Sequence, residues 1–350
     1  MLPEPVMLRI KDEFLDYGGI GASIIEISHR SKEFDLIVDE AISLFRELVS
    51  LPPEFTVLFI AGGARMQFSA VPMNLIARTP SRKALYVESG VFSANAAQDA
   101  VPYGQIEVIA SSRATGFDRV PEVPAGKIDQ DAAYLHITTN NTVYGTRWNR
   151  FPDAGRVPLV GDSTSEILSR VIDYSRFGLI YAGMQKNLGP SGTAIVAVRK
   201  DLMGTALPQT PTLLNYATMD ESHSMLNTPG TFNIYVAWLV LQWVKEQGGV
   251  AEMERRNNQK SALLYDCLDQ SKFYKPIAQR DHRSTMNVTF TFPSEELTGK
   301  FLKQADQEGL YALKGYRTAS GVRASIYNAM PLEGVRALVS FMNEFERTAG

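Results

Sequence analysis

Three short segments of the sequence carry residue types that could do chemistry. They are the small-residue turn Gly62-Gly63-Ala64-Arg65, the carboxylate of Asp162 and the amine of Lys186. Small residues let the backbone approach a phosphate closely, and the amides at the start of a helix point toward an anion. A carboxylate can hold a proton on a heteroaromatic ring nitrogen, and a lysine amine attacks aldehydes when its pKa is lowered. Each segment therefore matches one part of a phosphorylated aromatic aldehyde.

Each segment taken alone has a simpler interpretation. The glycine turn matches neither the Walker loop nor the dinucleotide fingerprint, and a tight strand-to-helix turn would explain it. Ser163-x-x-Glu166 resembles a capping box, which would make Asp162 a residue beside a helix start. Lys186 alone would be a solvated loop lysine. Together, a phosphate cradle, an aspartate and a lysine at the ends of strands of one sheet are the parts that hold pyridoxal phosphate.

Short apolar, β-branched runs must position these residues. Such runs, separated by helical or loop material, are typical of buried strands in a largely parallel α/β sheet. The seven predicted strands lie at 57–60, 84–87, 106–109, 134–137, 157–160, 179–181 and 194–198. Function is expected at the C-terminal ends of the strands, where the glycine turn, Asp162 and Lys186 all lie.

The pattern changes in the last third of the chain. Thr228 as cap and Pro229 at the first helical position predict a long helix that stops at Gly248-Gly249. A second helix is expected over 250–268, then strands at 286–292 and 322–327 and a closing helix at 332–347. These elements predict a smaller C-terminal domain, with a boundary within or just after the long helix.

The composition narrows the class of protein. The 350 residues include 35 Lys+Arg and 38 Asp+Glu, and the net charge of −3 provides no large positive field for nucleic acid. Cys267 is the only cysteine, which fits a reducing compartment and makes a zinc site improbable. The longest apolar stretch, 232–244, is too short to cross a bilayer of roughly 30 Å. We therefore expect a cytoplasmic globular protein with no nucleic-acid, membrane or metal partner.

Six segments resemble the phosphoserine aminotransferase family, a group of class V aminotransferases with the type I fold of pyridoxal-phosphate enzymes. They occur in the family's order at 28–34, 62–68, 162–165, 181–190, 227–229 and 323–330. Gln185-Lys186-Asn187 and Arg323-Ala324-Ser325-Ile326-Tyr327-Asn328 separate this family from its desulfurase and alanine aminotransferase relatives. The resemblance implies a large α/β domain, residues 14–245, on a mainly parallel seven-stranded sheet. Residues 1–13 and 246–350 would form a smaller α+β domain.

The resemblance also implies roles for individual residues. Lys186 would bind the aldehyde of pyridoxal 5'-phosphate and Asp162 would pair with its ring nitrogen. Phe92 would stack on the ring, and the other cofactor contacts would be Ala64, Arg65, Thr142, Thr164, Gln185, Asn227 and Thr228. Substrate contacts would be His29, Arg30, Arg65, Tyr316 and Arg323. The active unit would be a homodimer, because Asn227, Thr228, His29 and Arg30 would reach the site of the neighbouring subunit.

The implied activity is transamination between 3-phosphoserine with 2-oxoglutarate and 3-phosphohydroxypyruvate with glutamate, in serine biosynthesis. A phosphorylated threonine-like compound of pyridoxine biosynthesis is a further expected substrate. One alternative is another class V aminotransferase that acts on alanine or serine with glyoxylate. A second is an inactive, truncated form, because the family's Asn-Phe-x-x-Gly-Pro-Ala segment does not precede Met1. The chain also departs from common family residues at Phe92, Asn141 and Tyr316, where Trp, Glu and His are frequent.

Overall fold

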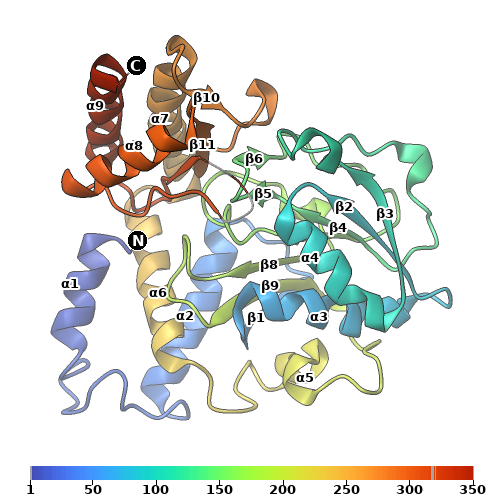
Figure 1. The fold of residues 1–350 in the computed structure, drawn as a ribbon. Helices are drawn as coiled ribbons and strands as arrows, with labels where there is room; N and C mark the ends of the chain where they lie inside the picture. Colours follow the sequence, from blue (N-terminus) through green and yellow to red (C-terminus); the bar gives the residue numbers. More distant parts are fainter. Residues whose placement is uncertain (1, 317–318, 320, 350) are drawn as a thin grey trace.

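A central sheet between two layers of helices forms most of the molecule (Figure 1). The computed structural model describes residues 2–316, 319 and 321–349. The sheet has seven strands in the order β1-β9-β8-β7-β4-β2-β3. Their bounds are β1 Phe55–Ala61, β2 Lys83–Glu88, β3 Gln105–Ser111, β4 Leu135–Thr138, β7 Leu159–Asp162, β8 Leu179–Gly183 and β9 Thr193–Arg199.

The sheet is mainly parallel. β3, β2, β4, β7 and β8 pair in parallel, whereas β9 runs antiparallel to both β1 and β8. All seven predicted strands are present, so the prediction of a mainly parallel α/β sheet is confirmed. β7 begins at Leu159, two residues later than expected, because Pro158 has no backbone N–H to donate.

Alternate residues of the strands supply two separate apolar cores, as expected for a sheet that is covered on both faces. On β1, Val57 and Phe59 belong to the core that includes α2 and α6. Leu58 and Ile60 belong to the core under α3 and α4. The helix bounds are α2 Lys32–Leu48, α3 Gly63–Leu75, α4 Val91–Ala100 and α6 Thr231–Glu246.

The long helix α6 starts later than the sequence predicts. Its N-cap is Gly230 and its first residue is Thr231, so the assignment of Thr228 as cap and Pro229 as first residue was wrong. Gly230 has a non-helical backbone, with φ −69° and ψ 77°, and its carbonyl accepts from the amide of Ile234 at 3.1 Å. The Pro229 carbonyl instead accepts from the Thr231 amide at 2.8 Å, which closes a turn before the helix.

A smaller antiparallel sheet, in the order β10-β11-β12, lies in the C-terminal part of the chain with α7, α8 and α9 (Figure 1). The bounds are α7 Gly249–Gln270, β10 Lys275–Pro276, β11 Asn287–Thr291, α8 Glu295–Gln307, β12 Val322–Ser325 and α9 Leu332–Ala349. These elements share a core of their own, which includes Phe290, Phe301 and Phe345. The strands and helices expected for the C-terminal region are thus present, each with shifted ends.

The N-terminal helix α1, Glu4–Glu13, lies against α6. Arg9 Nη1 donates to Gln242 Oε1 at 2.7 Å, and its guanidinium lies 4.8 Å from the ring centroid of Trp238. The assignment of residues 1–13 to the smaller domain, with 246–350, stays a prediction. Within the described residues, every helix is either too short or too polar to traverse a lipid bilayer.

Candidate active site

A cavity of about 290 Å³ lies where the parallel strands end. It receives residues from the loops after β1, β2, β4, β7 and β8 and from the segment before β9. Eight of the ten residues predicted to contact a cofactor line it: Ala64, Arg65, Phe92, Thr142, Asp162, Thr164, Gln185 and Lys186. The structure therefore brings these eight residues together from segments that are far apart in the sequence.

The turn after β1 presents the N-terminus of α3 to this cavity. Gly62 is the N-cap, with a left-handed φ of 97°, and α3 begins at Gly63. The first amides of a helix have no partner within the helix and carry partial positive charge. Gly183 of β8 keeps this end accessible, because a Cβ there would lie 3.1 Å from the Ala64 amide nitrogen and 2.5 Å from Gln185 Oε1. The arrangement suits an anionic group such as a phosphate.

Asp162 is the last residue of β7 and is 4% exposed. Its Oδ1 accepts from the Thr164 amide at 3.0 Å and from Thr164 Oγ1 at 2.6 Å. Burial raises the pKa of the Asp162 carboxyl above its usual value, while these two hydrogen bonds, the charge of Lys186 and a hydrogen bond to Tyr181 oppose the increase. Because the cost of burial dominates, a cationic partner in the cavity would stabilise the ionised carboxylate.

Lys186 follows β8 in a turn and reaches the same cavity. Its Nζ donates to Thr142 Oγ1 at 2.6 Å and lies 5.6 Å from the ring centroid of Phe92. Thr142 follows the short strand β5, Asn140–Asn141, whose hairpin partner is β6, Thr146–Arg147. A lysine amine held at the edge of an aromatic-lined cavity is placed to react with a carbonyl group.

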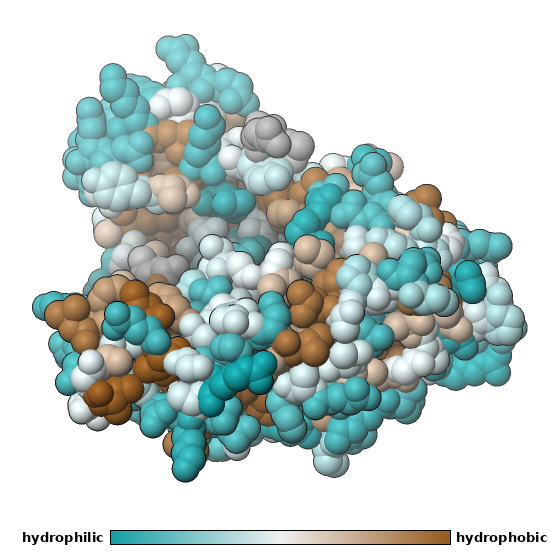
Figure 2. Space-filling model, turned by 90° about the horizontal axis from the view of Figure 1, so that it is seen from below, coloured by the Kyte–Doolittle hydropathy of each residue, from teal (hydrophilic) through white to brown (hydrophobic). Residues whose placement is uncertain are grey.

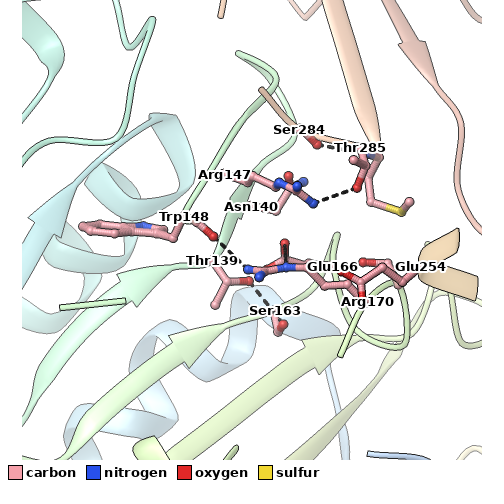
Figure 3. Close-up of polar contacts among 12 residues, drawn as sticks. Thr139, Asn140, Arg147, Trp148, Ser163, Glu166, Arg170, Glu254, Ser284 and Thr285 are labelled. Atoms are coloured by element: carbon pink, nitrogen blue, oxygen red, sulfur yellow. Dashed lines mark hydrogen bonds and ion pairs between the residues drawn. The ribbon is translucent and has the colours of Figure 1, made fainter. Parts of the chain in front are cut away.

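A buried polar layer beside the cavity joins the β5–β6 hairpin to the C-terminal region (Figure 3). Arg147 Nη1 donates to Thr285 Oγ1 at 3.0 Å, and Asn140 Nδ2 donates to Asn287 Oδ1 at 2.9 Å. In the turn after β7, Arg170 Nε pairs with Glu166 Oε1 at 2.8 Å. This turn contains no helix, so the alternative in which Ser163 caps one is wrong. The layer fixes the hairpin that leads to Thr142 and the turn that directly follows Asp162.

The side chains of two predicted cofactor residues, Thr164 and Arg65, already have protein partners. Thr164 Oγ1 donates to Asp162 and accepts from the Gly183 amide at 3.1 Å. Arg65 contacts Asp99 with two nitrogens, Nε at 2.9 Å from Oδ2 and Nη2 at 3.1 Å from Oδ1, and its side chain is 61% exposed. Arg65 is therefore at the rim of the cavity, where its guanidinium is accessible from solvent.

The other predicted site residues do not line this cavity. Asn227 lines a neighbouring apolar cavity of about 280 Å³, which also includes Gly62. The lining includes neither the predicted cofactor residue Thr228 nor any of four predicted substrate residues, His29, Arg30, Tyr316 and Arg323. The Tyr316 ring lies 6.2 Å from that of Phe92. Nε of Arg323 and Nε2 of His29 are buried without a hydrogen-bond partner among the described residues.

Several lining residues were missed by the sequence analysis. They are Phe68, Thr138, Asn140, Ser165, Ser191 and Gly192. Thr138 and Asn140 follow an apolar strand in the same way as Asp162 does, so their polarity at a strand end was a usable signal. Ser191 and Gly192 precede β9, and only the antiparallel direction of that strand brings them to this edge.

Comparisons with known proteins agree with this geometry. The family model described as aminotransferase class-V matches residues 1–338. A phosphoserine aminotransferase of Bacillus cereus is 49% identical over 346 residues, which cover 99% of this chain and 96% of the relative. That of Geobacillus kaustophilus is also 49% identical, over 347 residues covering 99% of this chain and 96% of the relative.

Solved structures are similar over the same length. The phosphoserine aminotransferase of Bacillus circulans subsp. alkalophilus has a TM-score of 0.96 and 43% identity, covering 100% of this chain and 97% of that one. The enzyme from Trichomonas vaginalis, solved with PLP bound, has a TM-score of 0.91 and 32% identity, covering 98% and 97%. These findings confirm the resemblance seen in the sequence. The chain belongs to the class-V aminotransferases and, within them, to the phosphoserine aminotransferase family.

Proposed function

We propose that the chain is a phosphoserine transaminase that uses pyridoxal 5'-phosphate. One observation carries the proposal: a single cavity joins the amine of Lys186, the buried carboxylate of Asp162 and the N-terminus of α3. This donor set fits the cofactor, because a helix N-terminus suits its phosphate, a carboxylate suits its ring nitrogen and an amine suits its aldehyde. The relatives named phosphoserine aminotransferase support the choice of substrate.

The residues that would hold the cofactor act at three separate points. The first amides of α3, with Arg65 and Gln185 beside them, would bind the phosphate. Asp162 would pair with the ring nitrogen, and Phe92 would offer an aromatic face to the ring. When bound, pyridoxal phosphate supplies an aldehyde that accepts the amino group and a ring that accepts the electrons left by the α-proton.

Lys186 and Asp162 have distinct tasks in the proposed reaction. Lys186 Nζ moves the α-proton of the substrate as general base and then as general acid. Thr142 Oγ1, which accepts a hydrogen bond from that amine, orients it toward the cavity. Asp162 stays ionised and keeps a proton on the ring nitrogen, an interaction that is strong because the carboxylate is shielded from water.

The substrates carry a carboxylate and, for phosphoserine, a phosphate, which favours guanidinium groups as ligands. We assign Arg323 to the α-carboxylate, since its Nε has no hydrogen-bond partner among the described residues. We assign four further residues to the substrate phosphate or to the side-chain carboxylate of glutamate. They are His29, Arg30, Tyr316 and Arg65, of which Arg65 lies at the rim of the cavity.

We further propose that the enzyme is a cytoplasmic homodimer in which His29, Arg30, Asn227 and Thr228 reach the site of the second copy. Exposed apolar side chains on α1, the loop after it and α2 support an interface: Met7, Leu8, Phe14, Leu15, Ile20, Ile25 and Leu36. Seen from below, apolar groups gather at the left of the molecule, on the side of α1 (Figure 2). Exposed apolar side chains that gather on one side of a protein are typical of an interaction surface.

Half-reaction spectra test the proposed substrate. The holoenzyme is mixed separately with phosphoserine, glutamate and alanine, and the absorbance of the aldehyde form of the cofactor is followed. Phosphoserine and glutamate are expected to convert it to the amine form, and alanine is expected to leave it unchanged. Conversion by alanine and not by phosphoserine would assign the chain to another class V transamination.

A further inference from the structure

A row of polar rings lies behind Asp162 on one face of the central sheet. Tyr181 of β8 pairs with Asp162 of β7, and Tyr86 of β2 pairs with His136 of β4. His136 also pairs with Val160, two residues before Asp162, so His136 and Asp162 project from the same face. Tyr86, His136 and Tyr181 are each at most 1% exposed, so water does not compete for their polar atoms.

The members of the row contact one another in sequence. The Tyr181 phenol lies beside the Asp162 carboxyl, because the two residues are paired neighbours on the same face of β8 and β7. His136 Nε2 lies 3.0 Å from Tyr181 Oη. The His136 ring stacks on Tyr86, with centroids 4.9 Å apart and an interplanar angle of 23°. His136 Nδ1 has no partner among the described residues, so the imidazole has a single polar contact.

The protonation states of His136, Tyr181 and Asp162 determine which side chain donates each hydrogen bond in this row. Burial lowers the pKa of His136 to about 3, so the ring is neutral and has one N–H. Burial raises the pKa of Tyr181 well above its usual value, and the nearby Asp162 charge adds to the increase, so the phenol keeps its single proton. An ionised Asp162 can only accept, hence Tyr181 donates to Asp162. His136 must then donate its Nε2–H to Tyr181 Oη and leave Nδ1 unprotonated.

We propose that Tyr181 and His136 are positioning residues for Asp162, which hold its carboxylate ionised and aimed at the ring nitrogen of the cofactor. This inference rests on the proposed function. Each donor to a carboxylate stabilises its anionic form, and a donor that itself accepts a hydrogen bond from a neutral ring is a stronger one. Tyr86 acts one step further away, because its ring fixes the plane of His136 while its own hydroxyl pairs with Tyr134 at 2.7 Å.

The first test compares Tyr181→Phe with Tyr86→Phe. Both variants remove one buried hydroxyl from the same face of the sheet, but only Tyr181 contacts Asp162. The holoenzyme is prepared with cofactor labelled with ¹⁵N at the ring nitrogen, and the NMR signal of that nitrogen is recorded. Tyr181→Phe is expected to move the signal toward that of a neutral ring and to lower kcat about 10- to 100-fold, with a much smaller change in KM. Tyr86→Phe is expected to leave the signal in place.

A second readout needs no cofactor. The ¹³C signal of the Asp162 carboxyl, assigned by its loss in Asp162→Asn, is titrated in the cofactor-free protein. Tyr181→Phe is expected to raise the pKa of Asp162 by about one unit or more. Because this titration needs no bound cofactor, it tests the effect of Tyr181 on Asp162 separately from the proposed transaminase function.

His136 is tested by replacement with Gln and with Leu. His136→Gln keeps an N–H near the position of Nε2 and is expected to preserve the carboxyl titration, whereas His136→Leu is expected to raise the pKa of Asp162. If Tyr181→Phe lowers thermal stability but moves neither the ring-nitrogen signal nor the Asp162 titration, the row has only a packing role and the inference is overturned. Equal shifts in Tyr181→Phe and Tyr86→Phe would also overturn it.

Discussion

Lys186 donates a hydrogen bond from Nζ to Oγ1 of Thr142 across 2.6 Å, although 44 positions separate the two residues in the chain. The contact joins the turn after β8 to the β5–β6 hairpin. It therefore ties the proposed reactive amine to a hairpin that the buried polar layer around Arg147 and Asn140 holds in place (Figure 3).

Replacement of Thr142 by Val tests this contact. The change removes the acceptor at nearly constant volume, so Lys186 loses its fixed orientation. We expect kcat to fall about 10- to 150-fold, because one hydrogen bond to a charged group contributes about 1.5–3 kcal/mol. Steady-state kinetics with phosphoserine provide the measurement. Thr142→Ser keeps the hydroxyl and should retain most of the activity; equal losses in the two variants would argue against a role for the hydroxyl.

Asp162→Asn tests two effects of the Asp162 carboxyl, one on transaminase activity and one on the pH dependence of the unfolding free energy. Burial raises the pKa of Asp162 in the folded chain, so between its usual value and the raised one the folded state binds more protons than the unfolded state. The unfolding free energy of the cofactor-free protein therefore falls as pH rises through that interval. Asp162→Asn should remove this fall and should lose most transaminase activity.

Urea unfolding of the cofactor-free protein from about pH 4 to about pH 8 checks the stability effect. Asp266→Asn, at an exposed position of α7, is the matched control and should follow the wild type at each pH. A stability difference between Asp162→Asn and wild type that does not change with pH would contradict the assigned burial cost.

Gly183→Ala tests whether the N-terminus of α3 binds the phosphate of the cofactor. A Cβ at this position would lie 2.5 Å from Gln185 Oε1 and 3.1 Å from the Ala64 amide nitrogen, so the proposed phosphate ligands must shift. We expect the Kd for pyridoxal phosphate, measured by fluorescence titration, to rise about tenfold or more, the equivalent of about 1.4 kcal/mol. Gly299→Ala, in α8 with open space around it, should leave that Kd unchanged. Unaltered binding in Gly183→Ala would place the phosphate elsewhere.

Arg323→Lys tests the assignment of the α-carboxylate ligand. A lysine ammonium cannot reproduce the two parallel hydrogen bonds of a guanidinium, so KM should rise for glutamate and phosphoserine alike, by about tenfold. Arg336→Lys, on the exposed face of α9, serves as the control because its side chain is 60% exposed. If KM is unchanged for both substrates, Arg323 does not bind the α-carboxylate.

Much of this fold is predictable from local sequence, because six of the seven strands of the central sheet are short, largely buried apolar runs, and only the edge strand β3 is mostly exposed. The ends of elements are less predictable, since they depend on contacts formed elsewhere. Ser163 and Glu166 have the spacing of a capping box, yet the Ser163 amide donates to the Tyr181 carbonyl at 2.8 Å and Glu166 pairs with Arg170. These partners occupy the Ser163 amide and the Glu166 carboxylate, the two groups that would pair with each other in a capping box.

The residues of the candidate site likewise differ in how far they could be predicted from the sequence. Asp162 and Lys186 stand out in combination with the glycine turn, because all three lie near the C-terminal ends of predicted strands. The parallel strands β7 and β8 bring the two charged residues to one edge. The row of Tyr86, His136 and Tyr181 gives no such signal, because aromatic residues inside strands are ordinary core residues. Only the register of β2, β4, β7 and β8 reveals that these rings lead to Asp162.

The central claim is that this cavity holds pyridoxal phosphate through Lys186, and borohydride reduction followed by peptide mapping tests it most directly. The reagent converts the link between cofactor and amine into a stable bond, so the labelled peptide identifies the lysine. We expect one label, on the peptide that contains Lys186, and no label in Lys186→Arg. A label on any other lysine, or an unlabelled wild-type protein after incubation with the cofactor, would contradict it.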